Sequence, residues 1–250
     1  YPITPSTSLM DSFKSYCTKF RKDPDTGKNN YCIIQAEDEL AAIGMVLGAN
    51  WNGARSFTPT SGPGISLMSE FIGYAYYAEV PAVLFDVQRT GPATGMPTRT
   101  QQGDILTCAF ASHGDTKHLL LFPANPEEAF YFAADSFDIA DKYQTPVFVL
   151  LDLDIGMNTW MCKNLEWDDS RKPNRGKVLT KEEIEKLDKF HRYLDKDGDG
   201  ICARTLPGVH PKGSYFTRGS GHDKWGRYTE DGDAYKEVVD RLTHKIQGAT

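Results

Sequence analysis

Short apolar runs alternate with longer helical patterns between residues 31 and 152, and this alternation constrains the possible folds more than any other feature of the sequence. The apolar runs are rich in β-branched and aromatic residues, and they predict strands at 31–35, 54–58, 82–87, 119–122 and 147–151. The periodic segments between them predict helices at 39–49, 65–78, 101–111 and 126–143. Such alternation produces right-handed β-α-β units, so we predict an α/β fold whose parallel, twisted sheet carries helices on both faces.

The pattern changes near residue 155, which divides the chain into a predicted domain of residues 1–155 and an extension of residues 156–250. A polar stretch opens the extension, a helical pattern follows at 181–194, and a glycine-rich segment leads to a last predicted helix at 234–246. We expect the extension to pack on the domain or on a partner subunit.

The composition is that of an ordinary globular protein, with 40% hydrophobic and 25% charged residues among 250. A formal net charge of −6 argues against nucleic acid as a partner, and no apolar run is long enough to predict a membrane span. The five cysteines are scattered and never spaced as C-x-x-C. We therefore expect reduced thiols in a cytoplasmic protein, and no iron–sulfur cluster of familiar spacing in this chain.

Parallel sheets bind ligands beyond the carboxyl ends of their strands, which directs attention to the loops at 35–39, 58–64 and 88–99. The loop 58–64 joins a predicted strand to a predicted helix. Free N–H groups and glycines at such a junction fit a carbonyl, carboxylate or phosphate, although a tight structural turn explains the same residues. The loop lacks the Gly-Lys-Ser/Thr ending of a phosphate-binding P-loop.

Charged side chains stand in the other two loops. Glu37, Asp38 and Glu39 precede a predicted helix, where first-turn carboxylates gain a few tenths to about 1 kcal/mol from the helix dipole. Capping accounts for one or two of them, so one is left to face the crevice, where desolvation would raise its pKa. Arg89 directly follows a predicted core strand, and its planar fork suits either a ligand carboxylate or a structural ion pair.

Two further segments carry candidate ligand groups. In residues 1–7, the proline at position 5 predicts that Thr4 is held extended with its hydroxyl presented, although a plain proline-rich arm has the same composition. Residues 195–200 match the first half of an EF-hand loop, but Leu206 stands where the bidentate Glu should be. The loop predicts either a solvated acidic turn or a divalent-cation site made by Asp195, Asp197 and Asp199.

Five co-linear motifs together resemble the alpha subunit of 2-oxoacid:ferredoxin oxidoreductases, and the 2-oxoglutarate type most of all. They lie at residues 1–7 (YPITPST), 36–39 (AEDE), 60–64 (TSGPG), 86–89 (DVQR) and 95–100 (GMPTRT). The resemblance implies that residues 1–155 form the pyrimidine-binding half of a thiamine diphosphate site. It also implies a separate beta subunit that holds the diphosphate, its Mg²⁺ and an iron–sulfur cluster.

The resemblance also implies roles for individual residues. Thr4 corresponds to the threonine that contacts the substrate carboxylate or carbonyl, and Arg89 to the arginine that pairs with the 2-oxoacid carboxylate. Glu39 aligns with the catalytic glutamate that bonds N1′ of the aminopyrimidine, whereas an alignment anchored on the strand end selects Glu37. The residues implied to line the cofactor are Thr60, Ser61 and Gly62.

The implied activity is oxidative decarboxylation of a 2-oxoacid, with 2-oxoglutarate as the expected substrate. The acyl group passes to coenzyme A and electrons pass to ferredoxin. The implied assembly is a dimer of heterodimers, and this chain is expected to be an alpha subunit or a fragment of a fused gamma–alpha polypeptide. Open alternatives are pyruvate or a branched-chain 2-oxoacid as substrate, another acyl or ketol chemistry on the same cofactor, and a non-catalytic scaffold stabilised by a divalent metal.

Overall fold

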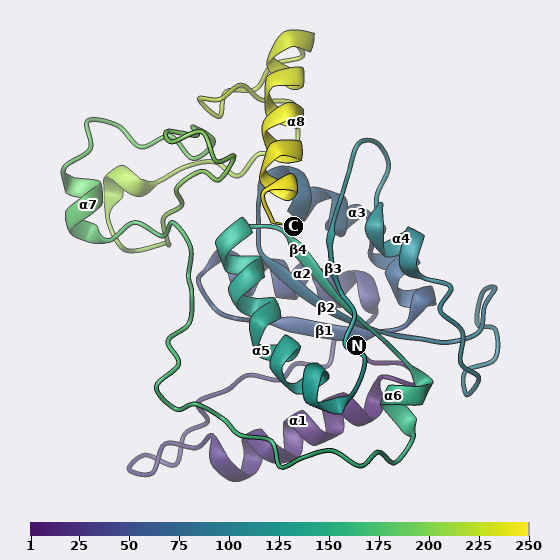
Figure 1. Ribbon diagram of the computed structural model, residues 1–250. Coiled ribbons are helices and arrows are strands. Elements are labelled where there is room, and N and C mark those ends of the chain that lie inside the picture. The colour runs from purple at the N-terminus through teal and green to yellow at the C-terminus, as the bar shows by residue number, and fades with distance from the viewer. Residues whose placement is uncertain (250) are drawn as a thin grey trace.

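A four-stranded parallel sheet in the order β1-β2-β4-β3 forms the centre of the computed structural model, which describes residues 1–249 (Figure 1). The strands are β1 (Phe57–Thr60), β2 (Ala82–Gln88), β3 (Leu119–Leu121) and β4 (Pro146–Asp152). Strand β2 lies between β1 and β4, and all seven of its residues are buried. The chain that leaves the carboxyl end of β2 therefore enters the middle of the ligand-binding edge.

Helices cover both faces of the sheet, as predicted. On one face, α2 (Glu39–Trp51), α3 (Gly62–Ala78) and α4 (Ile105–Ala109) pack against Leu84 and Phe148. On the other face, α1 (Thr7–Phe20) and α5 (Pro126–Tyr143) pack against the strand residues that follow these two in the sequence, Phe85 and Val149. Side chains alternate between the faces of a strand, so both faces need apolar residues and the strands read as continuous apolar runs.

The predicted helices of the domain are confirmed, with shifts at their ends. The helix predicted at 126–143 matches α5, and the Asn125 side chain caps it by accepting from the Glu128 N–H. The helix predicted at 101–111 shrinks to α4 because residues 102–104 instead cross the strand ends. There Gln102 donates to the Asp152 carboxylate at 2.9 Å, and the Asp104 N–H donates to the Gln88 side chain at 3.1 Å.

Two strand predictions need correction. Residues 31–35 form no strand, and Ile34 is 61% exposed. Their apolar side chains instead line a surface cavity beside Met45 and Ala49 of α2, so packing against a helix replaces strand pairing. Strand β1 begins three residues later than predicted, because the Asn50 side chain bonds both backbone groups of Ser56 and holds the chain in a turn.

The N-terminal segment also differs from the prediction. Thr4 lies in a turn closed by a 2.6 Å bond from the Ser6 N–H to the Ile3 carbonyl, rather than in an extended chain. Helix α1 follows immediately, at a place where no element was predicted, and Cys17 is its only buried residue. The helix packs Leu9 and Phe13 against the sheet and leaves most of its other residues exposed, and its apolar pattern was missed in the sequence.

In the extension the last predicted helix is confirmed as α8 (Gly232–Gln247), but the pattern at 181–194 is helical only in α7 (Lys181–Glu185). The other short elements are α6 (Leu153–Met157) and a 3₁₀ turn at Pro211–Gly213. Phe190, Arg192 and Tyr193 are all buried, and Arg192 could not share a helix face with the other two, which lie one and two positions away. Tertiary burial therefore overrides the helical pattern there.

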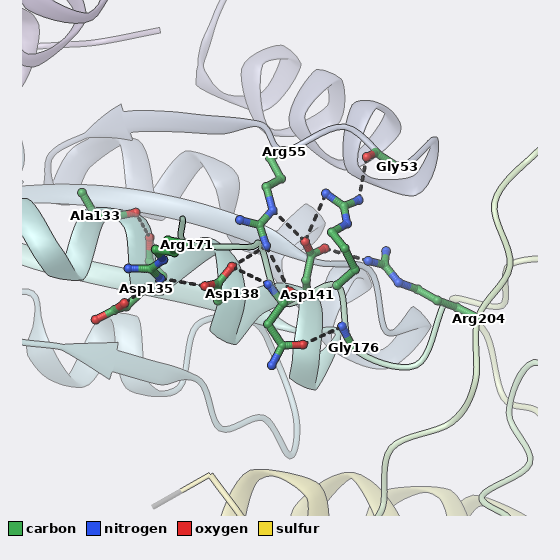
Figure 2. Close-up of polar contacts among 12 residues, drawn as sticks. Gly53, Arg55, Ala133, Asp135, Asp138, Asp141, Arg171, Gly176 and Arg204 are labelled. Atoms are coloured by element: carbon green, nitrogen blue, oxygen red, sulfur yellow. Dashed lines mark hydrogen bonds and ion pairs between the residues drawn. The ribbon is translucent and has the colours of Figure 1, made fainter. Parts of the chain in front are cut away.

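A network of arginine and aspartate side chains fastens the extension to α5. Figure 2 shows the guanidinium groups of Arg55 and Arg204 converging on Asp141, at 3.0 and 2.7 Å. Arg171 bonds Asp138 of the same helix at 2.6 Å, and also Asp135. Asp141 and Arg204 are both buried, so removing either side chain would leave the other as an unpaired buried charge and destabilise the fold.

A second network surrounds Glu79, which ends α3 and is 1% exposed. Its carboxylate accepts two bonds from Arg241, at 3.0 and 2.7 Å, and one from Lys245 at 2.9 Å, and both donors lie on α8. Arg192 donates to its carbonyl oxygen at 2.7 Å. One buried glutamate thus joins three cations of the extension to the core.

Among residues 1–249, no helix combines the length and apolar character that a bilayer span requires.

Candidate functional site

The side chain of Arg89 lies just beyond the carboxyl end of β2 and is 6% exposed. Its Nη1 donates to the carbonyl oxygen of Thr4, so residues 85 positions apart in the sequence come together. The Thr4 side chain remains exposed, and the Arg89 Nε is buried without a partner in the described chain. Arg89 thus keeps an unused donor and holds the backbone of a residue whose side chain is exposed, which suits a carboxylate site.

The loop 58–64 leads from β1 into α3. Ser61 takes the N-cap position of this 17-residue helix, and Gly62 and Pro63 form its first turn. Thr60 and Ser61 are fully buried, and the Ser61 hydroxyl has no hydrogen-bond partner among residues 1–249. A buried polar group without a partner is uncommon in a stable fold, so the Ser61 hydroxyl is a candidate ligand contact.

The two glycines at the start of α3 permit close approaches. A Cβ on Gly64 would lie 1.9 Å from the Thr60 hydroxyl oxygen and 3.1 Å from Cγ of Glu39. A Cβ on Gly62 would lie 2.5 Å from a carboxylate oxygen of Asp104. Any other residue would force these groups apart. Glycine is needed at both positions because side chains pack directly against the backbone there.

The three acids before α2 have separate environments. Asp38 caps the helix by accepting from the Ala41 N–H at 2.7 Å, and Glu37 is exposed. Glu39 is only 7% exposed and lies against the start of α3 at Gly64. Of the two glutamates that the alignment allows, Glu39 is therefore the one that adjoins the loop 58–64.

A cavity of about 360 Å³ opens between the start of α3, the segment after β2 and the start of α4. Gly62, Arg89 and Asp104 are among its lining residues. Asp104 was not among the predicted site residues, because the segment around it was predicted to be helical. The acid at position 86, inside an otherwise apolar strand, is the one sequence signal that points to a polar site here.

A fully buried acid, Asp86, lies next to the Asp104 side chain of this cavity. Asp86 is fully buried on β2, with Cys108 of α4 at 3.6 Å from its carboxylate and Asp104 within hydrogen-bond contact. Burial and the negative charge of Asp104 raise the pKa of the Asp86 carboxyl well above its usual range. Burial raises the pKa of Asp104 as well, and burial together with Asp86 raises the pKa of the Cys108 thiol.

The acidic loop of the extension lies apart from these residues. Oxygen atoms of Asp195, Asp197 and Asp199 lie within 4.8 Å of one another. The ammonium group of Lys177 bonds both Asp197 and Asp199 at 2.7 Å. Partial burial alone would lower the pKa of Lys177, but its bonds to the two carboxylates have the larger effect and raise it. A divalent ion remains a prediction, and it would have to displace this ammonium group.

Replacing Lys177 by methionine is expected to strengthen Ca²⁺ or Mg²⁺ binding at the acidic loop by on the order of tenfold, or about 1.4 kcal/mol. The substitution removes the internal cation and leaves the three carboxylates to repel one another. Calorimetric titration of the wild type and of K177M measures the difference. Lys196→Met, at an exposed lysine in the same loop, is the matched control. Equal affinities in all three proteins would show that the ammonium group does not compete with metal.

Fold and site together define an α/β protein with a candidate ligand site at the carboxyl edge of a parallel sheet, with a buried glutamate on one side and an arginine on the other. The family model described as "Pyruvate flavodoxin/ferredoxin oxidoreductase, thiamine diP-bdg" matches residues 1–195. The chain belongs to this family.

Curated relatives and a solved structure share most of this chain. "2-oxoglutarate synthase subunit KorA" of Methanocaldococcus jannaschii is 35% identical over 99% of the chain and 62% of its own length. "2-oxoacid:ferredoxin oxidoreductase 1, subunit alpha" of Sulfurisphaera tokodaii is 38% identical over 92% of the chain and 36% of its own length. The chain thus spans less than two thirds of either relative.

The solved structure is a 2-oxoglutarate:ferredoxin oxidoreductase from Magnetococcus marinus with 2-oxoglutarate, coenzyme A and succinyl-CoA bound. It superimposes on all of this chain with a TM-score of 0.85 at 29% identity, and this chain covers 41% of it. The likeness extends across the extension as well as the domain.

Proposed function

We propose that this chain is the alpha subunit, or the alpha part of a longer polypeptide, of a thiamine diphosphate-dependent 2-oxoacid:ferredoxin oxidoreductase. The proposed reaction converts 2-oxoglutarate and coenzyme A into succinyl-CoA and CO₂, and the electrons released reduce ferredoxin. The observation that carries the proposal is the buried Arg89, held against Thr4 at the carboxyl end of β2 with a donor unused. The family match and the substrates named for the relatives support the same reaction.

The residues of the site suit the pyrimidine half of the cofactor. The buried Ser61 hydroxyl lacks a partner among the described residues, and the carboxyl group of Glu39 lies beside the same loop with little exposure. Thiamine diphosphate, when bound, supplies the carbon nucleophile and electron sink that decarboxylation of a 2-oxoacid needs. Glu39 would hold a proton at N1′ of the aminopyrimidine, with Thr60, Ser61 and Gly62 beside the ring. Arg89 and the Thr4 hydroxyl would orient the 2-oxoacid.

We further propose that a beta subunit supplies the diphosphate site, its Mg²⁺ and the iron–sulfur cluster, in a cytoplasmic dimer of heterodimers. In this proposal the electrons pass from the cofactor to the cluster of that subunit and from there to ferredoxin.

The assembled enzyme, purified with its partner, tests the function. We expect viologen reduction that requires both 2-oxoglutarate and coenzyme A. Pyruvate and branched-chain 2-oxoacids in the same assay decide the substrate. CO₂ release without viologen reduction would indicate another chemistry on the cofactor, and inactivity with every 2-oxoacid would favour a scaffold stabilised by metal.

Replacing Arg89 by lysine is expected to raise KM for the 2-oxoacid by about 10- to 150-fold, the equivalent of one charge-assisted hydrogen bond, with a smaller change in kcat. A lysine keeps the charge but loses the planar fork. Steady-state kinetics of the assembled enzyme measure the change. Arg99→Lys is the matched control, because the Arg99 guanidinium contacts only its neighbour Thr98 among the described residues. An unchanged KM in R89K would remove Arg89 from the substrate site.

A further inference from the structure

Asp86 and Asp104 form a pair of acids, the first fully buried and the second partly buried at the cavity wall, for which the proposed reaction assigns no role. Asp86 belongs to β2, and Asp104 lies in the segment before α4. Their carboxyl groups are in hydrogen-bond contact, yet Oδ1 of Asp86 and Oδ2 of Asp104 are buried without a partner among residues 1–249. Two carboxylates without a cation between them repel each other strongly in such a place, whereas one proton turns the contact into a hydrogen bond.

The pair lies between the two halves of the candidate site. The carboxylate of Asp104 lies against Gly62 at the start of α3, and the Asp104 N–H donates to the Gln88 side chain at 3.1 Å. It also experiences the positive charge of Arg89. Within residues 1–249 the charged or titratable groups that act on the pair are Arg89 and the Cys108 thiol of α4, while α3 contributes the Gly62 N–H.

We propose that Asp86 and Asp104 are positioning residues that share one proton, and that their single negative charge balances Arg89 until a 2-oxoacid carboxylate binds there. The inference rests on the proposed function for its ligand. When the carboxylate of the ligand takes over the charge of Arg89, the pair loses its counter-ion. It then takes up a second proton from water and becomes neutral, so the buried site gains no net charge.

This arrangement explains two features of the sequence together. The acid at position 86 stands in the most buried strand of the sheet, where a carboxylate destabilises the fold unless it serves a purpose. Glycine at position 62 is required by the approach of Asp104. The pair thus links the loop beside the cofactor to the substrate arginine, and it makes binding of an acid depend on available protons.

The shared proton is tested by infrared spectroscopy on the assembled enzyme at neutral pH. We expect a carbonyl-stretch band of a protonated carboxyl group that shifts in D₂O and is lost in the double variant D86N/D104N. Asp115→Asn, at an exposed aspartate after α4, is the control and should keep the band. No such band in the difference between the wild type and the double variant would overturn the proposal. This readout does not depend on turnover, so it separates failure of the pair from failure of the proposed function.

The coupling to substrate is tested with glutarate, which has both carboxylates of 2-oxoglutarate but no oxo group to react. In the wild type its affinity should weaken by up to about tenfold for each unit of rising pH, because one proton is taken up on binding. The double variant D86N/D104N keeps the volume of both side chains but has no carboxyl group to protonate, so it should bind glutarate with an affinity that hardly changes with pH. Equal pH dependence in the two proteins would overturn the coupling, as would binding in the wild type that ignores pH.

Discussion

Replacement of Glu39 by alanine is expected to lower kcat/KM of the assembled enzyme by about 10²- to 10⁴-fold, the usual contribution of a positioned acid–base group. Glu39 is the acid before α2 that is buried against the start of α3. Removing it would take away the carboxyl group that exchanges a proton with the aminopyrimidine. Viologen reduction with 2-oxoglutarate and coenzyme A measures the loss.

Glu37→Ala is the matched control for this experiment. It removes the same functional group two residues away, from a side chain that is exposed. We expect kcat/KM within about twofold of the wild type, as for an exposed carboxylate without a structural partner. Glu39→Gln distinguishes packing from proton transfer, because the amide keeps the volume. Normal turnover in E39A with a large loss in E37A would transfer the catalytic role to Glu37.

Replacement of Glu79 by glutamine is expected to destabilise the protein by about 3–5 kcal/mol, the usual cost of breaking a buried ion pair from one side. The substitution leaves Arg241, Lys245 and Arg192 together with no anion in a buried place. Denaturant unfolding followed by circular dichroism measures the change. Glu70→Gln on the same helix is the control, since Glu70 is exposed and forms only a long contact with His113.

The same network predicts how stability depends on pH. Burial alone would raise the pKa of the Glu79 carboxyl, but Arg241 and Lys245 outweigh burial and hold it well below the usual 4.5. An acid with a lowered pKa stabilises the fold fully above pH of about 4.5, and this contribution is lost as the pH falls toward the folded-state pKa. The difference in the free energy of unfolding between the wild type and E79Q should therefore shrink as the pH falls below about 4.5. A constant difference between the two proteins from pH 7 to pH 3 would contradict this account.

The site was only partly predictable from the sequence. Arg89 and the loop 58–64 were predicted as site residues because parallel sheets place ligands beyond their strand ends, and that rule needs only the strand pattern. Whether Arg89 is a ligand group or part of an ion pair was left open, since the answer depends on what lies opposite. In the structure the Arg89 guanidinium contacts the Thr4 carbonyl. Within residues 1–249 it forms no ion pair with an acidic side chain. Asp104 was missed because its partners Asp86 and Gln88 lie on a strand, 16 or more positions earlier in the chain.

Local pattern alone determined the α/β class, the buried core strands, α5 with its Asn125 cap and the last helix, because periodicity and capping act over a few residues. Tertiary structure decided what depends on distant partners. It left residues 31–35 unpaired beside α2 and ended α7 early so that Tyr193 could be buried. It also brought Glu39 rather than Glu37 against α3, since burial of a charged side chain is set by the neighbours that the whole fold supplies.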